Sequence, residues 1–231
     1  YNYTVSYNPE FIAQGTILRD QSSPDMVLIG EGSKQAGDML EKIYIKHTSN
    51  EPRICRMTRT EAEICKIALN CFVTTKISFA NMIGDIVQKS GGNPHAVLEA
   101  IGSDSRVGLR YLGYGYGYGG PCFPRDNRAL SIYASDIGMP SDISTATDEI
   151  NKKHLSFQVS SFISSIDPQH PLVFDTVTYK PGTTIIEESQ QLAFVVEVAK
   201  AGYDITIREH PDTIKQVRDL YGDLFKYEVR K

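Results

Sequence analysis

Thr60-Glu61-Ala62-Glu63-Ile64-Cys65-Lys66-Ile67-Ala68-Leu69-Asn70 opens a long stretch in which apolar residues recur with the period of an α-helix. Thr60, followed three residues later by Glu63, has the form of a capping box, which satisfies free backbone amides at a helix start. The periodicity continues to Ser90-Gly91-Gly92. The sequence therefore predicts one helix of about eight turns, and an apolar helix of this length usually packs against a neighbouring bundle or a second subunit.

One face of this predicted helix carries polar side chains. Lys66, Asn70, Thr74, Ile77 and Asn81 are spaced by four, four, three and four residues, which places them in one row. Such a row is commonly a face in contact with solvent. A lysine and an amide one turn apart can instead stabilise the negative charge of an oxyanion. The helix alone does not choose between these two interpretations.

The remaining elements divide the chain into a helical middle and an α/β end. Helices are predicted at 93–102, 122–138 and 144–164, residues 50–57 read as a loop, and Tyr3–Ser6 reads as a strand. The end of the chain is predicted as a strand at 172–177, a helix at 189–201, a strand at 205–208 and a helix after Pro211. Strand-helix-strand order is typical of a parallel sheet with several strands. Since the chain also lacks an initiator methionine, we expect it to be part of a longer protein.

Composition narrows the classes of protein to consider. With 231 residues, of which 41% are hydrophobic and 23% charged, the chain fits one or two globular domains. A net charge of −4 without a basic run argues against a nucleic-acid partner, and no apolar stretch approaches the roughly 18 residues that span a membrane. The four cysteines (Cys55, Cys65, Cys71 and Cys122) show neither a CxxC pair nor metal-ligand spacing, which favours free thiols, a cytoplasmic location and no metal.

The segment Gly119-Gly120-Pro121-Cys122-Phe123-Pro124-Arg125-Asp126 places a thiol just before a predicted helix and four residues before a carboxylate. Glycines let the backbone approach the sulfur closely, Pro124 suits the first helical turn, and a helix N-terminus favours a thiolate. One interpretation is a nucleophile with a water-activating partner. The other is a buried structural cysteine in a glycine-proline turn.

Glycine and tyrosine alternate in residues 113–120, and Gly115 to Gly120 matches the letters GxGxxG. A dinucleotide fingerprint follows a strand and precedes a helix and a second strand that ends in an acid. Here the preceding segment, 106–112, contains a glycine and two arginines, and only helix follows. We therefore assign no cofactor to this run, which suits close approach to a ligand with aromatic faces for a sugar or base; a mobile loop is the alternative.

These segments together resemble the UDP-glucose/GDP-mannose dehydrogenase family over nearly the whole chain. Tyr7-Asn8-Pro9-Glu10-Phe11-Ile12-Ala13-Gln14-Gly15-Thr16 is similar to the segment that joins the family's first domain to its helical middle, and 60–70 to the start of its central helix. Ile101-Gly102-Ser103-Asp104-Ser105-Arg106-Val107-Gly108 and the Cys122 segment follow in the family's order. Tyr179-Lys180-Pro181-Gly182-Thr183 resembles the opening of the C-terminal domain.

The resemblance implies an α/β protein in three parts. Residues 1–16 would be the end of the N-terminal NAD-binding domain and a linker. Residues 17–166 would form an all-helical central domain for substrate binding and dimerisation, and 167–231 a partial Rossmann-like domain with a parallel sheet that binds the UDP-sugar. The N-terminal NAD-binding Rossmann domain itself would be absent from this chain.

The resemblance also implies an activity, the NAD-dependent oxidation of the C6 alcohol of a nucleotide sugar for polysaccharide biosynthesis. UDP-glucose is the first candidate, with UDP-N-acetylmannosamine and GDP-mannose left open, and the route passes through a cysteine-bound intermediate. The positions that match family catalytic residues are Cys122, Lys66, Asn70, Asp126 and Glu10. The matching substrate positions are Phe11, Ile12, Ile77, Arg106, Tyr111, Leu112, Tyr118, Gly119 and Lys180, and the matching cofactor positions are Gln14 and Arg125. A homodimer through the long helix is implied, and a non-catalytic sugar-nucleotide-binding or dimerisation module is the alternative.

Three positions depart from the family's common pattern on the cofactor side. Gln14 replaces a frequent glutamate, Arg125 a frequent lysine, and Glu187 an arginine expected near NAD. An acid in place of a base repels a pyrophosphate. Together with the missing domain, these departures predict that the chain alone neither binds NAD well nor turns over.

Overall fold

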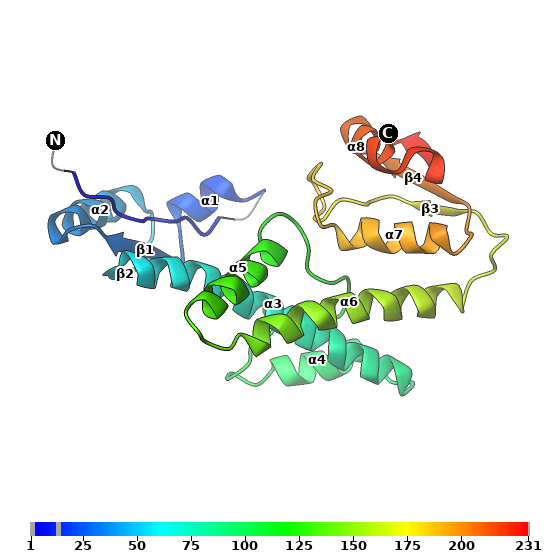
Figure 1. The fold of residues 1–231 in the computed structure, drawn as a ribbon, viewed down its shortest axis with the longest axis horizontal. Helices are drawn as coiled ribbons and strands as arrows, with labels where there is room; N and C mark the ends of the chain where they lie inside the picture. The colour runs from blue at the N-terminus through cyan, green and yellow to red at the C-terminus, as the bar shows by residue number, and fades with distance from the viewer. Residues whose placement is uncertain (1–2, 13–14, 231) are drawn as a thin grey trace. The chain divides into compact units, whose positions relative to one another are not determined.

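The computed structural model describes residues 3–12 and 15–230, shown in Figure 1. The chain folds as two compact units, the first ending at Leu69 and the second beginning at Asn70. The elements of the first unit are α1 (Ile17–Ser22), β1 (Met26–Glu31), α2 (Lys34–His47), β2 (Arg53–Thr58) and the start of α3 (Arg59–Lys89). The second unit holds the rest of α3, then α4 (Pro94–Gly102), α5 (Phe123–Asp136), α6 (Asp142–Ile163), β3 (Leu172–Phe174), α7 (Gln190–Lys200), β4 (Ile205–Glu209), α8 (Pro211–Tyr221), the 3₁₀ turn Gly222–Leu224 and β5 (Lys226–Val229).

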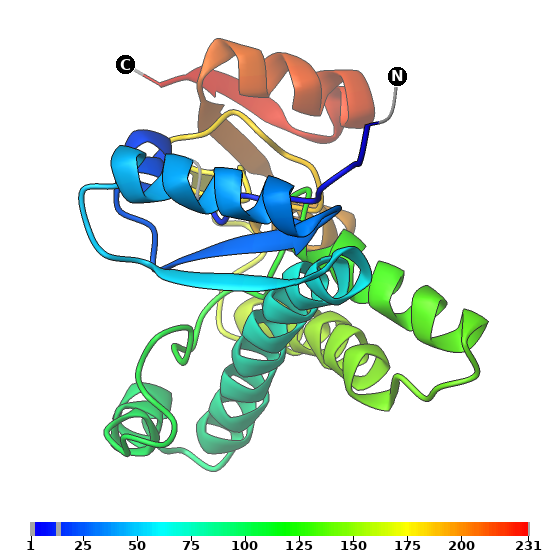
Figure 2. The same ribbon diagram turned by 90° about the vertical axis from the view of Figure 1, so that its left-hand side faces the viewer.

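The first unit is built on a parallel pair of strands. β1 and β2 pair in register from Met26↔Arg53 to Glu31↔Thr58, and Figure 2 shows α2, which joins them, lying across one face of the pair. The middle of β1 is fully buried. The prediction of an all-helical segment from residue 17 was therefore wrong at 26–31 and 53–58, which are strands, and most of the predicted loop at 50–57 belongs to β2.

Residues 5–7 lie against the end of β1. The predicted strand at Tyr3–Ser6 is absent; instead Tyr7 forms a single antiparallel bridge with Gly30, with backbone N···O distances of 2.8 and 2.7 Å. A Cβ on Gly32 would lie 2.2 Å from the Val5 carbonyl oxygen. Glycine is therefore required at position 32, because the chain's own N-terminal segment occupies the space that a side chain would fill.

The long helix α3 is confirmed, but it begins slightly earlier than predicted. The Thr58 amide donates to Glu61 Oε2 (2.7 Å) and the Glu61 amide to Thr58 Oγ1 (3.4 Å). This is a capping box. The pattern Thr-x-x-Glu occurs twice in overlapping frames, at 58–61 and 60–63, and the first of them caps the helix.

By length and composition α3 is able to cross a membrane, which corrects the prediction that no stretch approaches that size. One third of its most apolar window is buried inside the chain, where Ala80 packs with Leu98 of α4 and with Leu112. Core helices of globular proteins reach the same length and composition.

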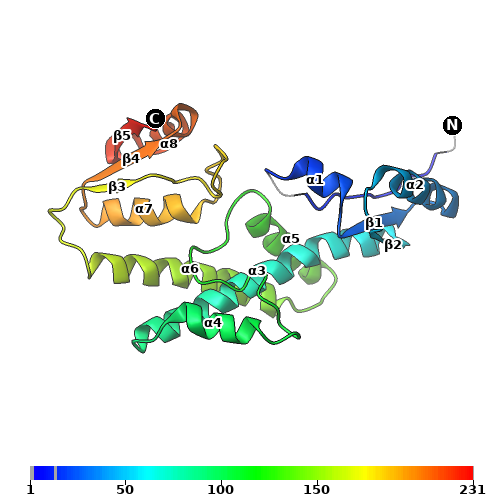
Figure 3. The ribbon, with the colours of Figure 1, turned by 180° about the vertical axis from the view of Figure 1, so that it is seen from behind.

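The second unit contains the predicted helices and a parallel sheet in the order β3-β4-β5. Asn93 caps α4 as expected, accepting a hydrogen bond from the His95 amide (3.0 Å). The sheet confirms the predicted α/β end and adds β5, which was not predicted. Its core joins residues of β4 and α7, and Leu155 and Val159 of α6 pack against that core. Figure 3 shows α6 running alongside α7, and α4 alongside α3.

Candidate active site

Cys122 lies at the N-terminus of α5 with an exposed, free thiol. The turn before it depends on Gly120, whose φ is +81° and whose absent Cβ would lie 2.5 Å from the Tyr179 ring. A residue with a side chain would be strained in that backbone conformation and would collide with the ring. The predicted helix start is confirmed, whereas the interpretation of Cys122 as a buried structural cysteine is wrong. An exposed thiol in a helix N-terminal turn is placed to act as a nucleophile.

Asp126, one turn further along α5, is buried and has both carboxylate oxygens hydrogen-bonded. The side-chain amide of Asn70 donates to its Oδ2 (2.6 Å), and Arg125 Nη2 lies 3.0 Å from its Oδ1. Hydrogen bonding to Asp126 raises the pKa of the Arg125 guanidinium above its ordinary value. The structure thus brings three predicted site residues together, with Asp126 orienting the amide of Asn70.

Lys66 contacts the segment that contains Glu10. Its Nζ donates to the Glu10 backbone carbonyl (2.6 Å) and stands 4.3 Å from the centre of the Phe11 ring. The Glu10 side chain is exposed, and Glu10, Phe11 and Ile12 line a cavity of about 320 Å³ within the first unit. Lys66 therefore fixes the backbone of Glu10 and contacts the ring of Phe11, both predicted site residues, while predicted Gln14 lies outside the described residues.

The polar row on α3 is largely buried. Thr74 and Asn81 are inaccessible to solvent, and Ile77 is half-buried. Thr74 Oγ1 accepts from the side-chain amide of Asn127 (2.7 Å), and Asn81 bonds to the backbone of 115–116. The interpretation of this row as a solvated face was therefore wrong in its middle and end.

Comparison with known proteins shows the family. The central-domain model of the UDP-glucose/GDP-mannose dehydrogenase family matches residues 60–153, and the family's NAD-binding-domain model matches residues 1–48. The chain belongs to the UDP-glucose/GDP-mannose dehydrogenase family. The prediction that the NAD-binding domain is absent was thus wrong, since β1 and most of the α2 crossover lie in the matched range.

Individual members of this family match most of the chain. A UDP-glucose 6-dehydrogenase of Pseudomonas aeruginosa is 33% identical over 91% of the chain and 47% of its own length. The enzyme AglM of Haloferax volcanii, also a UDP-glucose 6-dehydrogenase, is 30% identical over 95% of the chain and 52% of its own length. The structure of a UDP-glucose dehydrogenase from Pyrobaculum islandicum superposes with a TM-score of 0.84 at 32% identity, covering 97% of this chain and 51% of that one. The chain thus spans about half the length of the relatives that it matches.

Within this family member, several predicted substrate residues are buried in the second unit. Leu112 belongs to the core between α3 and α4, and Tyr118 is buried with its hydroxyl bonded to Asp148. A Cβ on Gly119 would lie 2.1 Å from the Glu188 carbonyl oxygen. The side chains of Leu112 and Tyr118 therefore pack inside the protein, and their predicted place in the lining of a nucleotide-sugar site stays a prediction. The atom that approaches Gly119 most closely therefore belongs to the chain itself: it is the Glu188 carbonyl oxygen.

Three other predicted substrate residues remain accessible to different degrees. Arg106 is exposed and paired with Asp104 (2.7 Å), and Lys180 is half-buried. Tyr111 is exposed and has a φ of +63°. This left-handed conformation is unfavourable for a residue with a side chain, and such strain is concentrated at functional sites.

Two of the three departures from the family pattern, Arg125 and Glu187, lie close enough for their charges to interact. Besides Asp126, the nearby carboxylate of Glu187 contributes to raising the pKa of Arg125, and Arg128 pairs with Glu188 (2.9 Å). The negative charge of the Glu187 carboxylate is thus attracted by the Arg125 guanidinium. Its predicted repulsion of a pyrophosphate is reduced to that extent.

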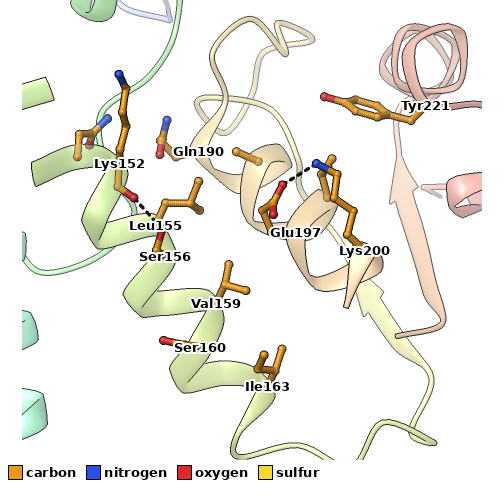
Figure 4. A pocket seen from close by; sticks show the side chains of 13 residues that line it. Lys152, Leu155, Ser156, Val159, Ser160, Ile163, Gln190, Glu197, Lys200 and Tyr221 are labelled. Atoms are coloured by element: carbon orange, nitrogen blue, oxygen red, sulfur yellow. Dashed lines mark hydrogen bonds and ion pairs between the residues drawn. The ribbon is translucent and has the colours of Figure 1, made fainter. Parts of the chain in front are cut away.

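A second cavity, of about 630 Å³, opens between α6 and α7, and Figure 4 shows its lining. Leu155, Val159 and Ile163 of α6 face α7, where Glu197 pairs with Lys200 (2.7 Å). None of the predicted site residues lines this cavity.

Sequence reasoning missed Asp85, Asn151 and His154, whose side chains hold residues 113–120. The available signal was their helical spacing: Asp85 lies one turn after Asn81 in α3, and His154 one turn after Asn151 in α6.

Proposed function

We propose that the chain forms part of an enzyme that oxidises the C6 alcohol of a nucleotide sugar, UDP-glucose first among the candidates, in two hydride transfers to NAD. The observation that carries this proposal is the exposed Cys122 thiol at the start of α5, one turn before a carboxylate that orients Asn70. The names of the similar proteins support the substrate class. UDP-N-acetylmannosamine and GDP-mannose are alternative substrates for the same chemistry.

Cys122 provides the covalent step. Its sulfur adds to the C6 aldehyde carbon left by the first oxidation, and the aldehyde oxygen takes up a proton to give a thiohemiacetal. Loss of hydride from that carbon and of the hydroxyl proton gives a thioester, and water then releases the carboxylate and returns the thiol. NAD, when bound, accepts the hydride in each oxidation. Asn70 and Lys66 are hydrogen-bond donors suited to the oxyanions that form along this route.

The remaining site residues support these groups. The bond from Asn70 to Asp126 Oδ2 holds the amide in one orientation, and the second lone pair of that oxygen can accept from a water molecule. Lys66 fixes the backbone at Glu10, whose exposed carboxylate suits proton transfer.

The described residues offer no dinucleotide turn at the most obvious place. Gly30 and Gly32 end β1 and precede α2, the position at which such a turn binds pyrophosphate. Residues 5–7 fill the space beside both glycines. Arg125 is therefore the described residue proposed to contact the cofactor.

A homodimer through α3 is part of the proposal. Phe72, Phe79 and Ile86 are exposed by 65%, 42% and 56%. Their seven-residue spacing places them on one side of the helix. An exposed apolar row of this kind suits a second copy of the same helix.

The deciding measurement is NADH formed per molecule of sugar by the full-length protein, with UDP-glucose, UDP-N-acetylmannosamine and GDP-mannose assayed side by side. We expect two NADH per UDP-glucose, loss of both in Cys122→Ser, and unchanged UDP-glucose binding by calorimetry. Cys55→Ser is the control for the loss of a thiol, because Cys55 lies in β2 and is not one of the proposed site residues. Sugar binding without NADH from any substrate would favour the alternative, a non-catalytic sugar-nucleotide-binding or dimerisation module.

A further inference from the structure

Residues 113–120, here the glycine-tyrosine loop, are held by side chains of α3 and α6. Asn81 of α3 accepts from the Gly115 amide (3.1 Å) and donates to the Tyr116 carbonyl (3.4 Å). Asn151 of α6 accepts from the Tyr118 amide (3.0 Å) and donates to the Tyr118 carbonyl (2.9 Å). The loop is therefore fixed at several backbone groups, which contradicts its interpretation as a mobile segment.

His154 of α6 makes the connection that joins these helices to the loop. It is only 1% exposed. Its Nδ1 lies 2.9 Å from both carboxylate oxygens of Asp85 in α3, and its Nε2 lies 2.6 Å from the Gly115 carbonyl oxygen. Gln158, one turn later, donates to the same carbonyl (3.1 Å).

The hydrogen-bond geometry determines how many protons His154 and Asp85 must carry between them. A carbonyl oxygen only accepts hydrogen bonds, and so does an ionised carboxylate, whereas a neutral imidazole has one N–H. Both contacts of His154 are satisfied together when the ring carries two protons and Asp85 is ionised. Loss of the second proton leaves one of two partly buried acceptors without this donor, which is costly for a polar group with little access to water.

The groups around His154 favour that charged state. Tyr114 places its ring 5.6 Å from the His154 ring and donates its hydroxyl to Asp85 (2.8 Å). Burial, and then the bond to Asp85, raise the pKa of Tyr114 well above its ordinary value, so this donor stays protonated. The ring of His95 in α4 packs edge-on against that of Tyr114, with ring centres 6.2 Å apart, and Asp148 of α6 accepts from the Tyr118 hydroxyl.

The glycine-tyrosine loop leads directly to the reactive cysteine. Gly117 approaches Asn151 so closely that a Cβ would lie 2.2 Å from its Oδ1, and Gly119 is similarly close to the Glu188 carbonyl. Cys122 follows three residues after Gly119. The backbone path into the Cys122 turn is thus set by contacts with little room for movement.

We propose that His154 is a positioning residue, which as an imidazolium joins Asp85 to the Gly115 carbonyl and so holds the glycine-tyrosine loop, and with it the Cys122 turn, in place. The effect on the loop is independent of catalysis. The effect on turnover rests on the proposed function.

The test compares His154→Gln with His95→Gln by nitrogen-15 NMR and amide hydrogen exchange. In the unmodified protein the hydrogen-bond geometry predicts nitrogen-15 shifts that show a proton on both ring nitrogens of His154. His154→Gln should speed exchange of the Gly115 and Tyr118 amides by about tenfold or more at all pH values, whereas His95→Gln should leave them unchanged. Asp85→Asn, which removes the charge and keeps the shape, is expected to give a neutral His154 ring.

Two outcomes would overturn the proposal: a neutral His154 ring at pH 6, or unchanged loop exchange in both His154→Gln and Asp85→Asn. These readouts need neither sugar nor NAD, so they are unaffected if the proposed reaction is wrong. If NADH forms, His154→Gln should lower kcat about tenfold with KM within about twofold, since the variant misplaces the thiol rather than the sugar. His95→Gln should change neither constant.

Discussion

At the scale of single residues, the bond between Asn70 and Asp126 predicts a measurable loss of stability. Asn70→Ala leaves the buried Asp126 Oδ2 without its amide donor, and a hydrogen bond to a charged group contributes about 1.5–3 kcal/mol. We expect the free energy of unfolding in urea to fall by that amount. In a double-mutant cycle with Asp126→Ala, the effect of Asn70→Ala should largely disappear; fully additive losses would show that the bond contributes little.

The cysteines provide a second residue-scale prediction. Burial raises the pKa of the Cys71 thiol to about 11, so at pH 8 only about one molecule in a thousand carries its thiolate. Iodoacetamide should therefore modify exposed Cys122 and spare Cys71, as followed by peptide mass spectrometry.

The same thiol predicts how stability depends on pH. Because the Cys71 thiol loses its proton near pH 9 in the unfolded chain and near pH 11 in the folded one, the protein should become less stable as pH rises through this window. Cys71→Ala should reduce that decline, and rapid Cys71 labelling at pH 8 in the native state would contradict its burial.

Residue roles were predictable where the signal is local. The start of α5 after Cys122 follows from adjacent glycines and prolines, whose backbone preferences act within a few residues. The burial of Leu112 and Tyr118 depends on α3, α4 and α6, which contact them from more than ten residues away. One sequence does not reveal which tyrosine of an alternating run turns inward.

At the scale of elements, the glycines of the glycine-tyrosine loop should differ sharply in their tolerance of alanine. Gly119→Ala would place a Cβ 2.1 Å from a backbone oxygen of the 183–189 segment, whereas a Cβ at Gly115 meets no atom within 4 Å. We expect Gly119→Ala to lower the free energy of unfolding by about 2 kcal/mol or more, in the range of overpacked sites. Gly115→Ala should be neutral or more stable by up to about 1 kcal/mol. Equal urea midpoints for the two variants would show that the loop adjusts freely.

Helices were easier to predict than strands for a physical reason. The start of α4 is encoded by its neighbouring residue Asn93, and the helix period is visible within each helical segment. β1 and β2 become strands by pairing with each other across 27 positions, as Met26 does with Arg53. β2 also contains two arginines, so its composition resembles an exposed loop until the partner strand is known.

At the scale of the whole molecule, the length and apolar character of α3 were recognised from sequence, but its surroundings were not. The helix buries part of its surface against α4 and the residues around α6. It still leaves Phe72, Phe79 and Ile86 exposed. Contiguous exposed apolar side chains of this size usually mark an interaction surface.

That surface predicts the assembly state of the protein. Phe79→Glu or Phe72→Glu puts a carboxylate into the proposed α3 contact, and a charge buried without a partner is strongly unfavourable. We expect the unmodified protein to sediment as a dimer and either variant as a monomer at the same concentration. The matched control is Leu220→Glu, because Leu220 of α8 is 66% exposed and lies outside α3. Since each changed side chain is exposed in the single chain, the helix content should stay the same. A monomeric unmodified protein, or dimers that survive both changes in α3, would place the apolar row in contact with something other than a second copy of this helix.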